Sequence, residues 1–265
     1  MSGFKLTRRA FIRSAALGSS GLALAGCDVF DGLSNPDHGL RNFFEGANGL
    51  TYHTQRLLGG GHTMAQEFSE ADIRQPQRPN GITAPDDAFY KDLLANNFAD
   101  WRLEVAGLVE KPLSLTRDQL MAMPTRTQIT RHDCVEGWSC IGKWKGVQLG
   151  PILDRVQPRP EARFVVFRCF DSMEGPSLDG RDSRYYESID FDDAHHVQTI
   201  LAYELNDQPL PVSNGAPLRC RVERQLGYKQ AKYVRSIELV TSFADIRGGK
   251  GGYWEDEGYE WYGGI

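Results

Sequence analysis

The residues around Cys134 in the sequence are unusual neighbours for a cysteine. The segment Thr130–Gly146 reads TRHDCVEGWSCIGKWKG and surrounds this thiol with polar, charged and aromatic side chains. A structural cysteine usually lies among apolar residues, because a thiol near water and charge tends to ionise and react. A thiolate is also a soft ligand that suits transition metals. The segment therefore predicts either a metal ligand or a reactive nucleophile at Cys134.

Residue types alone leave three chemistries to weigh for Cys134. A zinc site needs several Cys or His ligands at short spacing, and Cys140 lies too far along to form the usual CxxC pattern. A cysteine nucleophile could use His132 or His196 as its base. A soft or high-valent transition metal could take the thiolate as a ligand, with neighbouring His or backbone NH groups keeping it deprotonated. The spacing disfavours zinc and leaves the other two open.

The elements that must position this segment are mostly short strands. The run that starts at Trp101 alternates apolar and polar residues and breaks at Gly107, which predicts a strand followed by a turn. Thr116 can cap a short helix over residues 117–123, which Pro124 would stop. The local pattern thus places a strand and a short helix ahead of the cysteine segment.

Strands also dominate after the cysteine segment. Pro151 can begin a short helix within VQLGPILDRV. Four runs rich in Val, Ile, Phe and Tyr predict strands, namely RFVVFRCF, TILAYEL, PLRCRVE and AKYVRSIELV. The predicted class is α+β, with a mixed or antiparallel sheet, short interspersed helices and no internal repeat.

The first 26 residues have the layout of an export signal, in which arginines precede a modest apolar run that ends in small residues. The segment Thr7–Arg13 resembles a twin-arginine signal, whose pathway moves folded proteins. The segment Leu24–Cys27 resembles a bacterial lipobox, in which the cysteine is lipidated. We expect residues 1–26 to be a twin-arginine lipoprotein signal and Cys27 to carry a membrane anchor; the alternative is an ordinary signal with a chance cysteine at its end.

The sequence after the signal predicts a tether and then one folded domain. Residues 27–65 are rich in Gly, Asn and Asp with little periodicity, which is typical of a tether that leads into an N-terminal arm. The folded domain is expected over residues 66–265. Asp28 resembles the signal that retains lipoproteins at the inner membrane of some Gram-negative bacteria, so we expect the periplasmic side of that membrane.

Charge and cysteine content restrict the partners and the chemistry further. The chain carries 35 acidic and 30 basic residues, a formal net charge of −5, which disfavours a nucleic-acid partner. Four cysteines in an exported protein would suggest two disulfides, but folding in the reducing cytosol and strand-like surroundings favour free thiols. We expect free thiols at Cys134, Cys140, Cys169 and Cys220.

Three segments together resemble one family. They are ADWRLEVAGLVEKPLSLT, TRHDCVEGWSCIGKWKGVQLGPIL and YYESIDFDDAHHVQTILAYELNDQPLPVSNGAPLRCRVERQLGYKQAKYVRSIELV. In their order and spacing, over about residues 84–241, they are similar to the sulfite-oxidase-type molybdopterin oxidoreductases. Within that family they resemble the exported bacterial branch that includes the periplasmic methionine-sulfoxide reductases. The resemblance implies the sulfite-oxidase molybdopterin-binding fold and a Mo-molybdopterin cofactor.

The resemblance also implies roles for individual residues. In the family one cysteine is the only protein ligand of molybdenum, and Cys134 occupies that position, with its polar neighbours orienting and tuning the metal. Tyr185 matches a tyrosine that lines the substrate pocket of sulfite oxidases. The implied cofactor contacts are Asn80, Cys169, Asn214, Arg219, Gln230, Ala231 and Lys232.

Some of these implied contacts have a chemical reason and others depart from the family pattern. The guanidinium of Arg219 suits a phosphate group, and Gly227 lets the chain come close to a ligand. Cys169 stands where the reductase relatives have a threonine, which leaves a backbone or weak thiol contact. Asn80 matches the family's N-terminal asparagine only with loose spacing.

The residues after Cys134 bear on the substrate. Sulfite oxidases carry a Gly-Asn-Arg-Arg-like run whose arginines gather the sulfite dianion, whereas this chain has Glu136 and Trp138. The exchange favours a neutral oxo substrate such as a sulfoxide or N-oxide, unless Arg131 or Arg184 turns into the pocket. Two alternatives stay open: a sulfite dehydrogenase that passes electrons to a cytochrome, and a lipoprotein that only binds a ligand or scaffolds a complex.

The electrons of such a reaction need a partner. The sequence has no CxxCH haem motif, so we expect a redox partner protein, either a cytochrome or a membrane subunit linked to haem or quinone. His195 and His196 are expected to be structural or exposed. The acidic aromatic tail GGYWEDEGYEWYGGI is expected to cover a sheet edge or to form part of an electron-partner surface.

Overall fold

The computed structural model describes residues 39–59, 62–173 and 183–265. The predicted export signal and Cys27 lie outside the described residues. The chain divides into two compact units, residues 1–53 and residues 54–265. Within the described residues, no helix combines the length and the apolar character needed to cross a membrane.

A helix occupies a segment that was predicted to be an irregular tether. Helix α3 spans Gly39–Gly59, 21 residues, and crosses the boundary between the two units. The prediction of irregular structure was wrong here because Gly46 and Gly49 lower helix propensity and hide the helical periodicity. Whether this segment serves as a tether remains a prediction.

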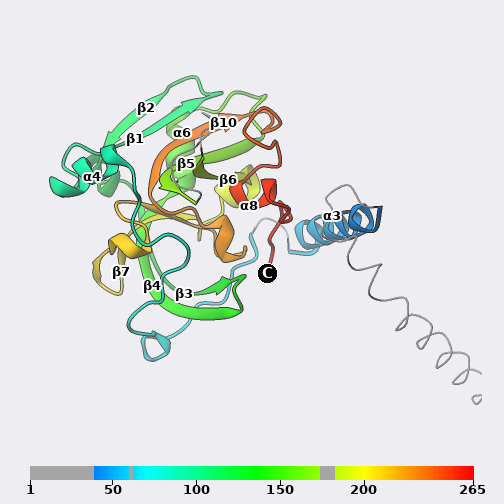
Figure 1. Ribbon diagram of the computed structural model, residues 1–265, viewed down its shortest axis with the longest axis horizontal. Coiled ribbons are helices and arrows are strands. Elements are labelled where there is room, and N and C mark those ends of the chain that lie inside the picture. Colours follow the sequence, from blue (N-terminus) through cyan, green and yellow to red (C-terminus); the bar gives the residue numbers. More distant parts are fainter. Residues whose placement is uncertain (1–38, 60–61, 174–182) are drawn as a thin grey trace, which may run out of the picture. The chain divides into compact units, whose positions relative to one another are not determined.

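The larger unit is built on two sheets, which Figure 1 shows as two separate groups of arrows. The first has the strand order β2-β1-β10-β5-β6. Strands β1 and β10 pair in parallel and the other neighbours are antiparallel, so the sheet is mixed, as predicted. Its strands are β1 (Arg102–Gly107), β2 (Leu113–Thr116), β5 (Phe164–Ser172), β6 (Arg184–Asp190) and β10 (Val234–Val240).

The second sheet is antiparallel and carries the segment around Cys134. Its order is β3-β4-β7-β8, and β9 also pairs with β7. The strands are β3 (Thr125–Cys134), β4 (Trp138–Gln148), β7 (Ile200–Leu205), β8 (Gln208–Pro209) and β9 (Arg219–Arg221). The four runs of Val, Ile, Phe and Tyr that were predicted as strands correspond to β5, β7, β9 and β10.

Short helices connect these strands, as the sequence predicted. Thr116 Oγ1 accepts a hydrogen bond from Gln119 N at 3.2 Å, and the Thr116 backbone N–H donates to Gln119 Oε1 at 3.0 Å, so a capping box begins α5. The helix ends at Met121, two residues before the predicted end. The helices of this unit are α4 (Ala88–Ala95), α5 (Arg117–Met121), α6 (Leu149–Val156), α7 (Phe191–Ala194), α8 (Tyr253–Asp256) and the 3₁₀ turns η3 (Glu70–Asp72), η4 (Val212–Asn214) and η5 (Gly227–Lys229).

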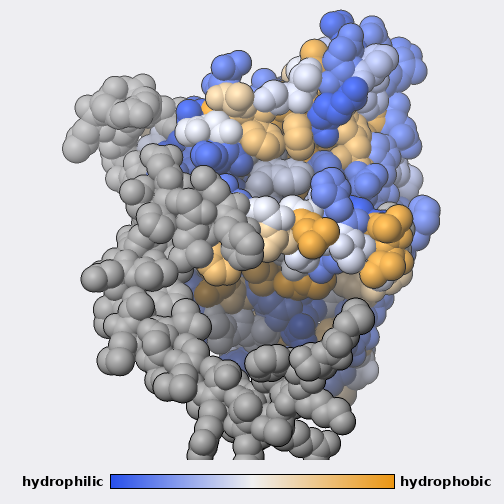
Figure 2. Space-filling model, turned by 90° about the vertical axis from the view of Figure 1, so that its right-hand side faces the viewer, coloured by the Kyte–Doolittle hydropathy of each residue, from blue (hydrophilic) through white to orange (hydrophobic). Residues whose placement is uncertain are grey.

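The hydrophobic core follows the alternation read from the sequence. Leu103 and Val105 of β1 are fully buried, while the residues between and beside them on the strand are exposed. Strand β5 lies between β10 and β6 and has buried residues on both of its faces. On the face drawn in Figure 2, the hydrophobic residues form separate groups among hydrophilic ones.

Two further predictions about the chain are confirmed. The four cysteines at 134, 140, 169 and 220 are free. The C-terminal tail covers a sheet edge, since Gly252 forms an antiparallel bridge with Glu187 on the edge strand β6. Figure 1 shows α8 beside β6 accordingly. The edge strand is thereby protected from pairing with another chain.

Candidate active site

Cys134 lies at the end of a β-hairpin. Strands β3 and β4 pair residue by residue from Thr125 opposite Val147 to Cys134 opposite Trp138. Gly137 closes the turn by donating its N–H to Cys134 O at 3.1 Å, with a φ of +85°. Glycine adopts this left-handed conformation without steric cost, so the chain can turn directly after the cysteine. The turn leaves the thiol half-buried at the end of the sheet.

A cavity of about 160 Å³ opens beside Cys134. Segments far apart in the sequence form its walls, including the loop before α4, the β3–β4 turn, the end of β5, the start of β6, the η5 turn and the C-terminal tail. The lining residues are Asn80, Gly81, Ile82, Cys134, Val135, Glu136, Asp171, Met173, Tyr185, Gly227, Tyr228, Gln230, Lys232, Trp254 and Tyr259. The cavity thus brings five of the predicted site residues to one place.

The surroundings of the Cys134 thiol act on its pKa in opposite directions. Burial raises the pKa, and the nearby Glu136 carboxylate adds to the rise. The backbone N–H of Glu136 and the guanidinium groups of Arg219 and Arg78 lower it, without fully offsetting the burial. In the protein alone the sulfur therefore stays protonated at neutral pH, and binding of a metal would displace the proton.

Of the two residues after Cys134 that the sequence set against an anion, Glu136 lines the cavity and Trp138 does not. The Trp138 Nε1–H donates to Glu136 Oε2 at 2.8 Å, and the guanidinium of Arg78 lies 4.5 Å from the centre of the Trp138 ring. Arg131 pairs with Asp133 at 2.8 Å. Among the described residues that line the cavity there is no arginine.

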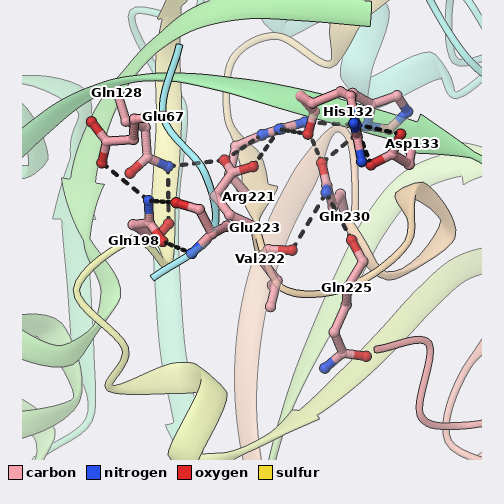
Figure 3. Close-up of polar contacts among 12 residues, drawn as sticks. Glu67, Gln128, His132, Asp133, Gln198, Arg221, Val222, Glu223, Gln225 and Gln230 are labelled. Atoms are coloured by element: carbon pink, nitrogen blue, oxygen red, sulfur yellow. Dashed lines mark hydrogen bonds and ion pairs between the residues drawn. The ribbon is translucent and has the colours of Figure 1, made fainter. Parts of the chain in front are cut away.

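A buried hydrogen-bond network supports the strand that carries Cys134 (Figure 3). His132 Nδ1 lies 3.1 Å from Gln230 Oε1, and Arg221 also donates to that oxygen. Arg221 pairs with Glu223 at 2.6 Å, and Glu223 accepts from Gln128 of β3 at 2.9 Å. Polar contacts therefore fix β3 against β9 and against the turn around Gln230.

Gly227 lies against the ring of His132, although the sequence led us to expect a ligand beside it. A Cβ at this position would lie 2.4 Å from His132 Cε1 and 2.6 Å from His132 Nε2. The glycine also lines the cavity. Its close approach therefore accommodates the His132 ring, which the sequence did not indicate.

Two buried cations lie at and behind the cavity wall. Lys232 Nζ donates to the carbonyl oxygens of Asn80 at 2.6 Å and Ser213 at 2.8 Å. Arg219 donates to Asn80 Oδ1 at 3.0 Å and to Asn214 O at 3.2 Å. Within the described part of the chain, neither cation has a carboxylate at ion-pair distance. The sequence placed these four site residues (Asn80, Asn214, Arg219 and Lys232) at the cofactor, and the structure brings them together.

The donors in this group fit an anionic cofactor. Arg219 Nε and Asn214 Nδ2 are buried and have no hydrogen-bond partner among the described residues. Burial and the neighbouring Arg221 lower the pKa of Arg219 to about 9, and burial and Arg219 lower that of Lys232 to about 7. A phosphate would supply the acceptors that Arg219 and Asn214 lack. The three N–H bonds of Lys232 already donate to the carbonyl oxygens of Asn80, Ile82 and Ser213, so a phosphate would complete only its charge.

Asp171 lines the cavity, and its carboxyl group has a strongly shifted pKa. Burial raises its pKa to about 7, although the Lys232 ammonium opposes the rise. Its Oδ1 has no hydrogen-bond partner among the described residues. The sequence reading missed this residue because a lone aspartate at a strand end gave no signal.

Tyr185 lines the cavity, as predicted. Its hydroxyl donates to Tyr228 O at 2.5 Å, and its ring stacks on Tyr253 at 5.8 Å. Burial and the nearby Glu187 hold the pKa of Tyr185 well above its ordinary value. The phenol therefore remains protonated and is fixed in one orientation.

Three residues that were predicted to contact the cofactor make contacts within the protein instead. Cys169 is buried on β5 opposite Val234, and Ala231 O accepts from Cys220 N at 2.8 Å. Neither Cys169 nor Ala231 lines the cavity. Gln230 lines it, but its side chain serves the network beneath the Cys134 strand.

The tail supplies cavity residues that the sequence reading did not place there. Trp254 and Tyr259 line the cavity together with Tyr228 and Met173. The density of aromatic residues in the tail was a signal, but it was attributed to edge covering and to a partner surface. His195 is exposed and His196 buried outside this cavity, as expected for residues outside the site.

Comparisons with known proteins agree with this geometry. A family model described as oxidoreductase molybdopterin binding domain matches residues 91–245. A relative from Azospira oryzae, named putative protein-methionine-sulfoxide reductase subunit YedZ1, is 36% identical over 258 residues, covering 97% of this chain and 87% of the relative. A protein-methionine-sulfoxide reductase catalytic subunit MsrP from Xanthomonas axonopodis pv. citri is 36% identical over 165 residues, covering 59% of this chain and 51% of that protein.

Other matches are shorter or weaker. MsrP from Campylobacter jejuni is 34% identical over 154 residues, covering 56% of this chain and 52% of that protein. The chain thus spans about half the length of both MsrP relatives. The sulfane dehydrogenase SoxCD from Paracoccus pantotrophus has a TM-score of 0.49 at 22% identity, covering 57% of this chain and 40% of that one.

The mixed-sheet fold and the thiol-bearing cavity with its buried cations define a molybdopterin-dependent oxidoreductase. The chain belongs to the family of oxidoreductases with a molybdopterin binding domain, of the sulfite-oxidase type. Its cofactor is molybdopterin. Arg219 and Asn214 have the unpartnered buried donors that fit the anionic part of it, and Lys232 adds positive charge beside them.

Proposed function

We propose that the chain reduces a neutral sulfoxide to the sulfide at a molybdenum ion ligated by Cys134. The observation that carries this proposal is the wall beside the thiol, where the Glu136 carboxylate lies among apolar and aromatic side chains and no described arginine is present. The one cation among the described lining residues is Lys232, whose ammonium already donates to three backbone carbonyl oxygens. Such a wall repels a dianion such as sulfite and tolerates a neutral S–O dipole. The names of the relatives support a sulfoxide as substrate.

The reaction balances as a two-electron reduction, in which the sulfoxide takes up two electrons and two protons and yields the sulfide and water. When bound, the molybdenum cofactor supplies the redox chemistry that removes the oxygen atom. The residues of the chain bind and orient. Arg219, Lys232 and Asn214 would hold the anionic part of the cofactor, and Tyr185 keeps a protonated hydroxyl at the cavity wall.

The proposal also includes the source of the electrons and the cellular location of the protein. We infer a separate redox partner, a cytochrome or a membrane subunit linked to haem or quinone. The signal-like start supports twin-arginine export and a lipid anchor on Cys27, at the periplasmic side of the inner membrane. Mass spectrometry of the N-terminus tests the anchor, and an unlipidated N-terminus would contradict it.

The substrate is tested with a panel of electron donors and acceptors. Protein produced with its export signal is supplied with reduced viologen and sulfoxides or N-oxides, and in parallel with sulfite and ferricyanide or cytochrome c. We expect faster sulfoxide reduction than sulfite oxidation. Robust sulfite oxidation with micromolar affinity would reverse the proposal in favour of a sulfite dehydrogenase.

The metal ligand is tested by Cys134→Ser. A hydroxyl is a harder and far less acidic ligand than a thiol, so we expect loss of molybdenum and of all turnover. The pterin should stay bound through Asn214, Arg219 and Lys232. Cys140→Ser is the matched control, because Cys140 is buried on β4 and does not line the cavity. A Cys134→Ser protein that kept both its molybdenum and its turnover would refute the ligand assignment.

A further inference from the structure

The C-terminal tail forms an aromatic wall of the active-site cavity. Trp254 stacks on Tyr259 with ring centres 5.3 Å apart and planes inclined by 26°. Tyr259 meets Tyr228 edge to face at 5.3 Å. All three rings line the cavity that contains Cys134. We refer to Tyr228, Trp254 and Tyr259 as the aromatic wall.

The aromatic wall is connected to Tyr185, the tyrosine that the sequence placed at the substrate pocket. Tyr253 lies edge to face against Trp254 at 5.3 Å and stacks on Tyr185 at 5.8 Å. The hydroxyl of Tyr185 returns to the carbonyl oxygen of Tyr228. The rings and this hydrogen bond form a closed circuit, so the position of each ring is constrained by two neighbours.

Buried polar contacts hold the tail in place. Glu255, between Trp254 and the end of α8, pairs with Lys229 at 2.5 Å, and both side chains are fully buried. The Tyr228 hydroxyl donates to Glu260 O at 2.6 Å. Leu226 N donates to Gly263 O at 2.8 Å. The wall is therefore a built part of the site, although Trp254 and Tyr259 lie outside the family match over residues 91–245.

The wall is accessible from the cavity and from solvent. Tyr259 is 40% exposed and Trp254 is half-buried, whereas Tyr228 is almost fully buried. Aromatic rings attract apolar groups, and sulfur makes favourable contacts with them. The methyl groups of a sulfoxide carry partial positive charge, which the face of a ring also favours. The aromatic wall is therefore suited to bind the carbon substituents of a sulfoxide and not its oxygen atom.

We propose that Trp254 and Tyr259 determine specificity by binding the apolar substituent of a methyl sulfoxide whose oxygen points away from the wall. This inference rests on the proposed sulfoxide reduction and names the class of sulfoxide. The favoured substrates carry one methyl group and one longer apolar chain, as the side chain of an oxidised methionine does. Dimethyl sulfoxide is too short to use the whole wall.

The test compares two substrates that differ only in chain length, dimethyl sulfoxide and methyl butyl sulfoxide, with reduced viologen as the electron donor. Because a hydrophobic pocket gains from each added methylene, Trp254→Ala and Tyr259→Ala should raise KM for methyl butyl sulfoxide about tenfold or more. The KM for dimethyl sulfoxide, kcat and the molybdenum content should change little. Trp254→Phe should restore most of the affinity.

Tyr262→Ala is the matched control, because Tyr262 is an aromatic residue of the same tail that does not line the cavity. Tyr259→Ala keeps the test valid if the half-buried Trp254→Ala folds poorly. An unchanged ratio of the two KM values in both alanine variants would overturn the inference. Failure of the wild-type protein to reduce any sulfoxide would instead overturn the proposed function, so the two failures are distinguishable.

A binding measurement without turnover provides a second readout. Methyl butyl sulfoxide added to the oxidised enzyme without reductant should change tryptophan fluorescence, because Trp254 lines the cavity. The change should disappear in Trp254→Phe and persist in Tyr262→Ala. An equal change in wild type and Trp254→Phe would contradict contact between the substrate and Trp254.

Discussion

Two groups of buried cations in this protein have the same burial and opposite electrostatics. In the paired group, Lys229 contacts Glu187 and Glu255 at 2.5 Å each, and Arg221 contacts Glu223 at 2.6 Å, with all five side chains fully buried. In the cofactor group, Arg219 and Lys232 donate mainly to carbonyl oxygens, and the described residues place no carboxylate at ion-pair distance.

The pKa values show what the difference means. Burial lowers the pKa of Lys229, but Glu187 and Glu255 more than offset it, so the pKa is raised. Burial lowers the pKa of Lys232 to about 7, and the nearby Arg219 adds to the fall. Buried charges are stable only when paired or neutralised. The charges of the paired group are therefore compensated within the fold, whereas the cofactor group has the charge that an anionic ligand would complete.

The largest effect on stability is expected from removing a cation of the paired group. Lys229→Met leaves Glu187 and Glu255 buried without a counter-ion, so we expect the free energy of unfolding to fall by about 3–5 kcal/mol. Urea unfolding of the cofactor-free protein measures the loss. A loss below about 1 kcal/mol, the size of a surface ion pair, would show that the two groups do not differ as described.

A smaller, pH-dependent effect is expected from Asp171, which lies beside the cofactor group. Its folded pKa is about 7, whereas the unfolded value is near 4, so between these pH values the folded state holds a proton that the unfolded state has lost. The stabilisation from Asp171 is thus present at pH 4 and is lost as the pH rises through 7.

The pH effect is measured against Asp171→Asn in cofactor-free protein. The difference in free energy of unfolding between wild type and Asp171→Asn should decline by roughly 2–4 kcal/mol from pH 4 to pH 7.5. Thermal or urea unfolding at several pH values gives the comparison. A difference that does not vary with pH would mean that Asp171 is ionised throughout.

The smallest effect on stability is expected within the cofactor group itself. Arg219→Met removes a buried cation that lacks a carboxylate, so cofactor-free stability should stay within about 1 kcal/mol of wild type or rise. Cofactor content should fall sharply, because the guanidinium is the strongest phosphate donor of the group. A stability loss as large as that of Lys229→Met would place Arg219 in the paired group instead.

Much of the fold could be predicted because it depends on local pattern. The strands with alternating or continuous apolar residues, the capping box at Thr116 and the mixed sheet all follow from short segments of sequence. Helix α3 could not be predicted, since its glycines and polar residues lack a clear apolar face. The β3–β4 hairpin was also not predicted, because its polar side chains pair through the buried network around Arg221 rather than through an apolar core.

The candidate site was predicted where a residue type is chemically unusual in its context. Cys134 among polar residues is such a case. Asn214, Arg219 and Lys232 followed from the resemblance of three segments, and Asn80 from a separate match to the family with loose spacing. Asp171 and Trp254 are ordinary in their own segments. Their chemistry arises from burial and from the cavity they share, neither of which a local pattern reports.

The sequence by itself determined the class of the protein, and it supplied a thiol at Cys134 suited to a soft metal and cationic side chains suited to an anionic cofactor, because residue type and order fix what chemistry is available. The tertiary structure alone decided which cations are paired and which are not, and it brought the tail to the cavity. The physical reason is that electrostatic and aromatic contacts depend on distance and burial, and these are set by segments that lie far apart in the chain.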